Sequence, residues 1–195
     1  LTRPTGVMLG FEISLNPFMA CPAWREIADL PHTEKIAHLQ QPEFRARILA
    51  ERQEDHLMRT RVTQWDRIFP LGDPPDYEPA ADKSVAARAA REGRSAEEVG
   101  YDLLLENDGK TILYRPLSNY AYGDLETVSD MMQHPNSLIG LGDGGAHVGV
   151  LTDASAFTYM LTHWTRDRTR GDKAPLPWAI KRMTRDNAAA IGVND

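Results

Sequence analysis

The sequence has little cysteine, no long apolar run and no excess of positive charge. Cys21 is the single cysteine among 195 residues, so an internal disulfide framework and a CxxC metal knuckle are both excluded. A lone thiol is typical of a reducing compartment, and we interpret the protein as cytoplasmic. No stretch approaches the roughly 20 apolar residues that cross a bilayer, so no membrane association is expected. The formal net charge of −6 argues against nucleic-acid binding, which needs a basic surface.

What is present is the composition of a folded protein. Apolar residues make up 42% and charged residues 26%, which is enough apolar material for a core. The length predicts one domain, or one domain and a fragment. The first residue is not Met and no signal peptide precedes the first apolar segment, so we expect a processed or excised piece of a longer protein.

Three short apolar segments predict strands, and the rest of the chain is mainly helical in pattern. The strands are expected over residues 6–15, 111–114 and 137–142. Helices are expected over 24–30, 34–39, 42–52, 83–92, 95–106, 124–134, 153–164 and 177–183. Trp65, Ile68 and Phe69 are the expected buried contacts of a mixed region, and the Pro-rich segment 70–82 predicts a connector.

From residue 109 onward the expected order is strand, helix, strand, helix, which is typical of a parallel βαβα arrangement. A closed (β/α)8 barrel needs eight strands and about 250 residues. Three strands therefore exclude a complete barrel but not a part of one.

The stretch from Leu138 to His147, LIGLGDGGAH, is the most informative. It runs from a predicted buried strand into a glycine-rich turn and puts Asp143 at the strand's C-terminal end, where parallel α/β folds gather ligands and catalytic groups. The glycines allow a substrate or metal to approach closely. A carboxylate there can bind a cation or take a proton from water. The alternative is that Asp143 only shapes an Asp-Gly turn.

Two other motifs match known binding sites in part, but their surrounding sequence excludes those sites. Gly140, Gly142 and Gly145 match GxGxxG, but the next predicted helix begins about eight to ten residues too late to hold a pyrophosphate. The HxE at His32 and Glu34 lacks the PCxxC that zinc deaminases require.

The segment GLGDGGAHVGVLTDASAFTYMLTHW (140–164) closely resembles the last barrel strand and helix of the amidohydrolase superfamily. It is most similar to the N-acyl-D-amino-acid deacylases (D-aminoacylase-like, amidohydrolase family 3). PLPWAIKRMTRDNAAAIGV (175–193) resembles the terminal helices of that superfamily, and RPTGVMLGFEISLNPF (3–18) resembles a late barrel strand.

The resemblance implies an α/β fold. The chain would be a helix-rich fragment of a (β/α)8 (TIM) amidohydrolase barrel with a helical insertion, and not a closed barrel by itself. Residues 1–16 would form a late barrel strand, 17–108 the helical insertion, and 109–195 the last βαβα units.

The resemblance also implies an activity, which is the zinc-dependent hydrolysis of a linear amide in an N-acyl-D-amino acid or a similar small molecule. Asp143 would be both the catalytic group and a metal ligand, and it is the one residue of the family's ligand set that maps onto this chain. No HxH pair is present. Zinc is thus expected in the intact enzyme, with most ligands absent from this chain, and the isolated chain is expected to be inactive.

Further candidates surround Asp143. Gly144, Gly145, His147 and Tyr120 are the expected substrate-binding residues, although His147 fits a core or helix-approach position equally well. Asn119 and Tyr122 are weighed with Tyr120 as pocket residues. Cys21 fits a buried thiol better than a nucleophile.

Two other classes of function stay open at this point. One is a non-catalytic helical interaction module, and the other is a metal-free small-molecule-binding domain. We also expect a homo-oligomer, or association with the rest of the barrel, because residues 7–13 with Leu138, Ile139 and Leu141 would be partly uncovered.

Overall fold

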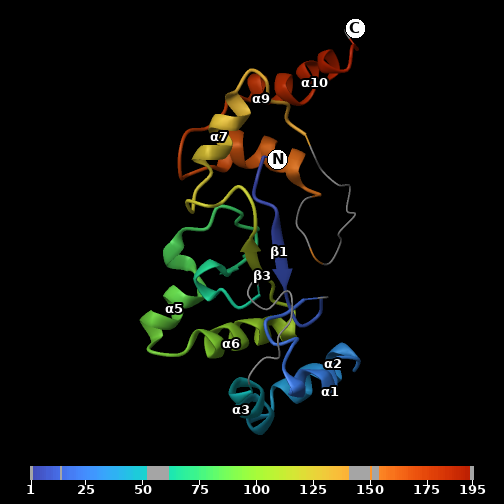
Figure 1. Cartoon of the computed structure of the whole chain (residues 1–195), viewed down its shortest axis with the longest axis vertical. Helices are drawn as coiled ribbons and strands as arrows, with labels where there is room; N and C mark the ends of the chain where they lie inside the picture. Colours follow the sequence, from blue (N-terminus) through green and yellow to red (C-terminus); the bar gives the residue numbers. More distant parts are fainter. Residues whose placement is uncertain (1, 14, 52–61, 141–149, 151–153, 194–195) are drawn as a thin grey trace. The chain divides into compact units, whose positions relative to one another are not determined.

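A computed structural model describes residues 2–13, 15–51, 62–140, 150 and 154–193 (Figure 1). The chain forms two compact units. We call Val7–Arg115 the central unit, and Leu1–Gly6 with Pro116–Asp195 the terminal unit. The two units are defined by the contacts that residues make within the chain. The expected segments 1–16, 17–108 and 109–195 are instead positions in a barrel, and they stay a prediction.

The central unit contains a small open sheet. Its strands are β1 (Gly6–Leu9), β2 (Phe69–Pro70) and β3 (Leu113–Pro116), in the order β1-β3-β2. Figure 1 labels β1 and β3. The predicted strand over 6–15 is therefore shorter, because the Gly10 amide turns back to donate to the Leu15 carbonyl. The predicted strand over 111–114 is shifted by two residues. β2 pairs with β3 in the antiparallel direction, with Phe69 opposite Tyr114.

The helices of the central unit agree with the expected ranges to within two or three residues at each end. They are α1 (Pro22–Ile27), α2 (His32–Leu39), α3 (Pro42–Ala50), α5 (Val85–Glu92) and α6 (Ala96–Gly109), with short 3-10 turns η1 (Trp65–Arg67) and η2 (Ala81–Lys83). Gly93 ends α5 in the left-handed conformation at φ 66°, which costs glycine little. Ser95 and Glu98 form the predicted capping box of α6.

The last residues of α6 form the predicted turn rather than a regular helix. Asn107 and Asp108 have φ values of 52° and 56°, and Gly109 follows at 75°. Regular α-helical geometry in α6 therefore ends before Glu106. The chain then enters β3.

An aromatic cluster forms the core of the central unit. Phe11 stacks on Trp24 at a centroid distance of 5.5 Å, and Phe18 meets the edge of Tyr101 at 5.2 Å. The Tyr101 hydroxyl donates to the Leu39 carbonyl at 2.7 Å, and burial raises the pKa of this phenol. The expected contacts Trp65, Ile68 and Phe69 are likewise buried, which confirms that prediction.

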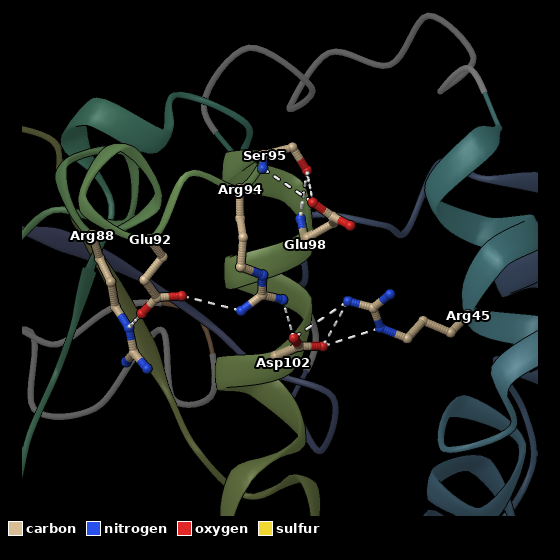
Figure 2. Close-up of polar contacts among 7 residues, drawn as sticks. All are labelled: Arg45, Arg88, Glu92, Arg94, Ser95, Glu98 and Asp102. Atoms are coloured by element: carbon tan, nitrogen blue, oxygen red, sulfur yellow. Dashed lines mark hydrogen bonds and ion pairs between the residues drawn. The ribbon is translucent and has the colours of Figure 1, made fainter.

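A chain of charged side chains lies on the surface of α3, α5 and α6 (Figure 2). Asp102 accepts hydrogen bonds from Arg45 at 3.0 Å and from Arg94. Arg94 also pairs with Glu92, whose pKa is lowered mainly by the hydrogen bond from Arg88. Exposed ion pairs each contribute little to stability, so this network adds little to what the aromatic core supplies.

The terminal unit is helical in its described part. Its helices are α7 (Glu126–Gln133), α8 (Ala156–Tyr159), the π-helix η3 (Met160–Asp167), α9 (Leu176–Met183) and α10 (Arg185–Ala190). The Thr2 hydroxyl donates to the Ala156 carbonyl at 2.6 Å, and the Trp164 indole donates to the Thr2 carbonyl at 2.6 Å. These two bonds hold the start of the chain against α8 and η3. Across the described ranges, no helix is both long and apolar enough to cross a bilayer.

The prediction of a strand over residues 137–142 is wrong for its described part. Residues 137–140 have no strand hydrogen bonds. A strand needs a neighbouring strand to pair its backbone, and here the side chains of Arg182 and Asn187 donate to the Ser137 and Ile139 carbonyls instead. The parallel βαβα arrangement expected from residue 109 onward is therefore not seen in the described residues.

The expected uncovered face is also only partly present. Val7, Leu9 and Phe11 are at most 2% exposed, so other residues of this chain cover these side chains. Ile139 is 3% exposed, whereas Leu138 is 54% exposed. Leu141 lies outside the described residues.

Gly100 on α6 allows a close approach of Trp65. A Cβ atom at Gly100 would lie 2.6 Å from Cη2 of Trp65, which is too close for any real contact. Alanine normally stabilises a helix interior over glycine by about 1 kcal/mol, but overpacking costs about 1–3 kcal/mol. We expect Gly100→Ala to lower the free energy of unfolding by about 1 kcal/mol in urea titrations. The loss should vanish when Trp65→Leu is the background, and an increase in stability would contradict the packing argument.

The large apolar side chains that are exposed in the described part of the chain all lie in the terminal unit. They are Leu117, Tyr122, Met131, Leu138, Phe157, Leu161, Leu176, Ile180, Ile191 and Val193. Such side chains favour association, so light scattering at about 100 micromolar should detect a dimer. Ile180→Asp on α9 should shift the equilibrium toward monomer, whereas Lys181→Asp should not. A monomer at that concentration would argue against self-association.

Candidate active site

The sequence-predicted site falls largely outside the described residues. Asp143, Gly144, Gly145 and His147 are not among them, so the structure does not test their roles. Tyr120 and residues 137–140, which precede Asp143 in the sequence, are described.

Residues 137–140 approach Asp143 with their backbone held by side chains. The Arg182 guanidinium donates through Nη2 to the Ser137 carbonyl at 2.7 Å and also contacts the Ser137 hydroxyl at 3.0 Å. The Asn187 amide donates through Nδ2 to the Ile139 carbonyl at 2.7 Å. These bonds set the position from which the chain continues toward Asp143.

A cavity of about 290 Å³ lies against the same segment. Its wall is mixed, with an amide, two hydroxyls and apolar side chains, contributed by Thr2, Asn119, Met131, Met132, Ser137, Leu138 and Ile139. Asn119 has a φ of 58°, a left-handed conformation that Asn tolerates better than most residues. A role for Asn119 in binding substrate stays a prediction.

Tyr120 is buried at 7% exposure, and its hydroxyl accepts a hydrogen bond from Arg170 at 3.0 Å. Arg170 also donates to the Gly123 carbonyl at 2.9 Å, so the pair stabilises the turn that precedes α7. Tyr122 is 82% exposed. A substrate contact by Tyr120 stays a prediction, but its hydroxyl already has this structural partner.

Arg168 and Arg182 are two of the buried arginines that sequence reasoning missed. Arg168 has a fully buried side chain that lies 4.4 Å over the Trp164 ring and pairs with Glu126 of α7 at 2.8 Å. Local sequence predicts only a charged loop there. For Arg182 a signal existed, because it lies one helical turn after the buried Ala179 on α9.

Three or more metal-binding side chains do not come together anywhere in the part of the chain that the structure describes. The described residues by themselves therefore do not fit a zinc ion. Asp143 and His147 lie outside them.

Cys21 is a buried thiol, as the sequence suggested. It is 1% exposed, and Sγ donates to the Ile48 carbonyl at 3.9 Å. Burial, and secondarily the charge of Glu51, raise its pKa to about 11. A thiol that stays protonated at neutral pH is not a nucleophile.

The native protein should therefore react slowly with a thiol-specific disulfide reagent at pH 8. A pKa about two units above the ordinary value leaves roughly 100-fold less thiolate than in the unfolded chain. Because the folded thiol keeps its proton to higher pH than the unfolded one, stability should fall as the pH rises from about 9 to 11. Cys21→Ala removes both effects and is the control, and equal native and unfolded rates would contradict the assignment.

The comparison with known families covers nearly the whole chain. The sequence model of a protein family, described as "Amidohydrolase family", matches residues 5–195. No curated protein and no solved structure is significantly similar to the chain. The match includes both units and the segment around Asp143. The chain therefore belongs to the amidohydrolase family.

Proposed function

We propose that this protein hydrolyses a linear amide bond in an N-acyl-D-amino acid or a related small molecule. Membership of the amidohydrolase family supports a hydrolase and is the observation that carries the proposal. The finer substrate class rests on the resemblance of residues 140–164 to N-acyl-D-amino-acid deacylases. A cytoplasmic location and a homo-oligomeric state, or association with the rest of a barrel, belong to the same proposal.

Asp143 is the proposed proton-transfer group. Its carboxylate takes a proton from the water that attacks the amide carbonyl, and it then delivers that proton to the leaving amine. One group serves both steps because the proton taken in the first is the proton given in the second. Gly144 and Gly145 let the substrate approach the backbone, and His147 contacts the substrate or orients the carboxylate.

The cavity beside Ile139 supports a substrate with an apolar part. Asp143 is the fourth residue after Ile139, and an extended chain spans at most about 3.6 Å per residue, or roughly 14 Å in all. A substrate that reaches from Asp143 toward the cavity would meet Met132 and Ile139 as apolar contacts and Asn119 as a polar one.

Zinc enters the proposal only through the family resemblance. When bound, a zinc ion would lower the pKa of a coordinated water toward neutrality. Asp143 is the one ligand that this sequence offers by resemblance. Among the described residues, no three metal-binding side chains lie close enough together to hold an ion.

Asp143→Asn tests the proposed role in the intact protein. The amide cannot carry the proton, so turnover of an N-acyl-D-amino acid should fall by a factor of roughly 100 to 10,000 while the melting temperature changes little. Asp130→Asn makes the same change at an exposed position on α7 and should leave turnover unaltered. Steady-state kinetics on paired D and L substrates give the measurement. Near-normal turnover in Asp143→Asn would leave Asp143 as a turn former and favour a non-catalytic module.

A further inference from the structure

The central unit contains a cavity of about 580 Å³, which is lined by α2, by the turn that joins α6 to β3 and by Glu12. Its wall carries charges of both signs beside a short apolar strip. We propose that this cavity binds a small zwitterion, namely a free amino acid with an aliphatic side chain. Hydrolysis of the substrate proposed above would release such an amino acid, but the binding site does not rest on that hydrolysis.

The fold holds the two main walls of this cavity close together. Nε2 of His32, the first residue of α2, donates to the Asp108 carbonyl in the turn at 2.9 Å. A Cβ atom at Gly109 would lie 2.7 Å from Cγ1 of Ile36, so glycine allows the turn to approach α2 closely. Both walls are therefore in place before a ligand binds, as they are in most small-molecule sites.

Three charged side chains line the cavity without forming an ion pair to any described residue. They are Glu12, Asp108 and Lys110. By contrast, each of the arginines drawn in Figure 2 pairs with an acidic side chain. Glu12 and Asp108 can therefore attract the ammonium group of a ligand, while Lys110 attracts its carboxylate.

The uncharged part of the wall suits an aliphatic amino acid. Ile36 and Ala37 of α2 offer apolar contacts to its side chain. Nδ1 of His32 is buried and has no hydrogen-bond partner among the described residues. Because Nε2 carries the hydrogen that bonds the Asp108 carbonyl, Nδ1 of the neutral ring is left as an acceptor. An ammonium group is the kind of donor that this acceptor lacks.

Ligands with one kind of charge fit this wall less well. An anion would be attracted by Lys110 but repelled by Glu12 and Asp108. A simple amine would leave Lys110 without a partner. A metal ion needs at least three ligands, and no such group of His, Cys, Asp and Glu side chains occurs among the described residues. The combination of charges therefore favours a ligand that carries both signs.

Isothermal titration calorimetry on the full chain tests the proposal with both enantiomers of leucine and with two analogues. Isocaproate lacks the ammonium group, and isoamylamine lacks the carboxylate. Neither analogue contains an amide bond that the protein could hydrolyse. We expect one enantiomer of leucine or both to bind with a dissociation constant of about 0.1 to 1 mM. Each analogue should bind at least about tenfold more weakly, because each loses a charge-assisted hydrogen bond.

Variants that remove one charge locate the ligand in this cavity. Glu12→Gln and Lys110→Gln should each weaken leucine binding at least about tenfold. The controls Glu43→Gln and Lys83→Gln make the same changes at other exposed positions of the central unit and should leave binding unaltered. The Cε1 proton resonance of His32 should also move when leucine is added to the native protein.

The outcomes separate this site from the proposed hydrolysis. Leucine binding that persists in Glu12→Gln and Lys110→Gln but is lost in Asp143→Asn would overturn the inference, because the ligand would then lie at the proposed active site. Equally tight binding of isoamylamine, or no binding of leucine at about 10 mM, would overturn it as well. Cavity binding in a protein that hydrolyses none of the substrates would support the inference and overturn the proposed function instead.

Discussion

Backbone carbonyl groups that leave water need hydrogen-bond donors, and in the terminal unit side chains supply them. Arg182 serves Met132 and Ser137, and Asn187 serves Ile139. An unsatisfied buried carbonyl costs about 1–3 kcal/mol, so these donors make an irregular backbone tolerable at this position. The backbone at Met132, Ser137 and Ile139 therefore depends on side chains that lie more than forty residues further along the chain.

Other arginines act in the same way elsewhere in the terminal unit. Arg168 is buried against Trp164 and pairs with Glu126, and it also donates to the Asp172 carbonyl at 3.0 Å. Arg170 bridges Tyr120 and Gly123. Arginine suits this role because its planar group offers several donors in fixed directions. The unit is thus held by polar cross-links between helices as well as by apolar contacts.

The central unit is stabilised differently. Its aromatic side chains pack together, and the exposed ion pairs of Figure 2 lie on the surface over α3, α5 and α6. Among the described residues it leaves no large apolar side chain exposed, whereas the terminal unit leaves ten exposed. This difference makes the terminal unit the part of the chain that is suited to contact other protein surfaces.

Local signals in the sequence determined where α5 ends and where α6 begins. Ser95 caps α6 through Glu98, and Gly93 ends α5, because a cap depends on residues only a few positions apart. The residue pattern around Asp143 likewise indicated the family to which the match over residues 5–195 assigns the chain. The site itself was less accessible to sequence reasoning, which chose Asn119 and Tyr120 but passed over their supports.

Only the tertiary structure decided how residues 137–140 are held. Their apolar pattern predicts a strand, but a strand forms only where another strand pairs with it. Arg182 lies 45 residues from Ser137 in sequence, and Asn187 lies 48 from Ile139. A local sequence pattern cannot predict contacts between residues so far apart in the sequence. These contacts form only when the helices pack and bring a side-chain donor to a buried carbonyl group.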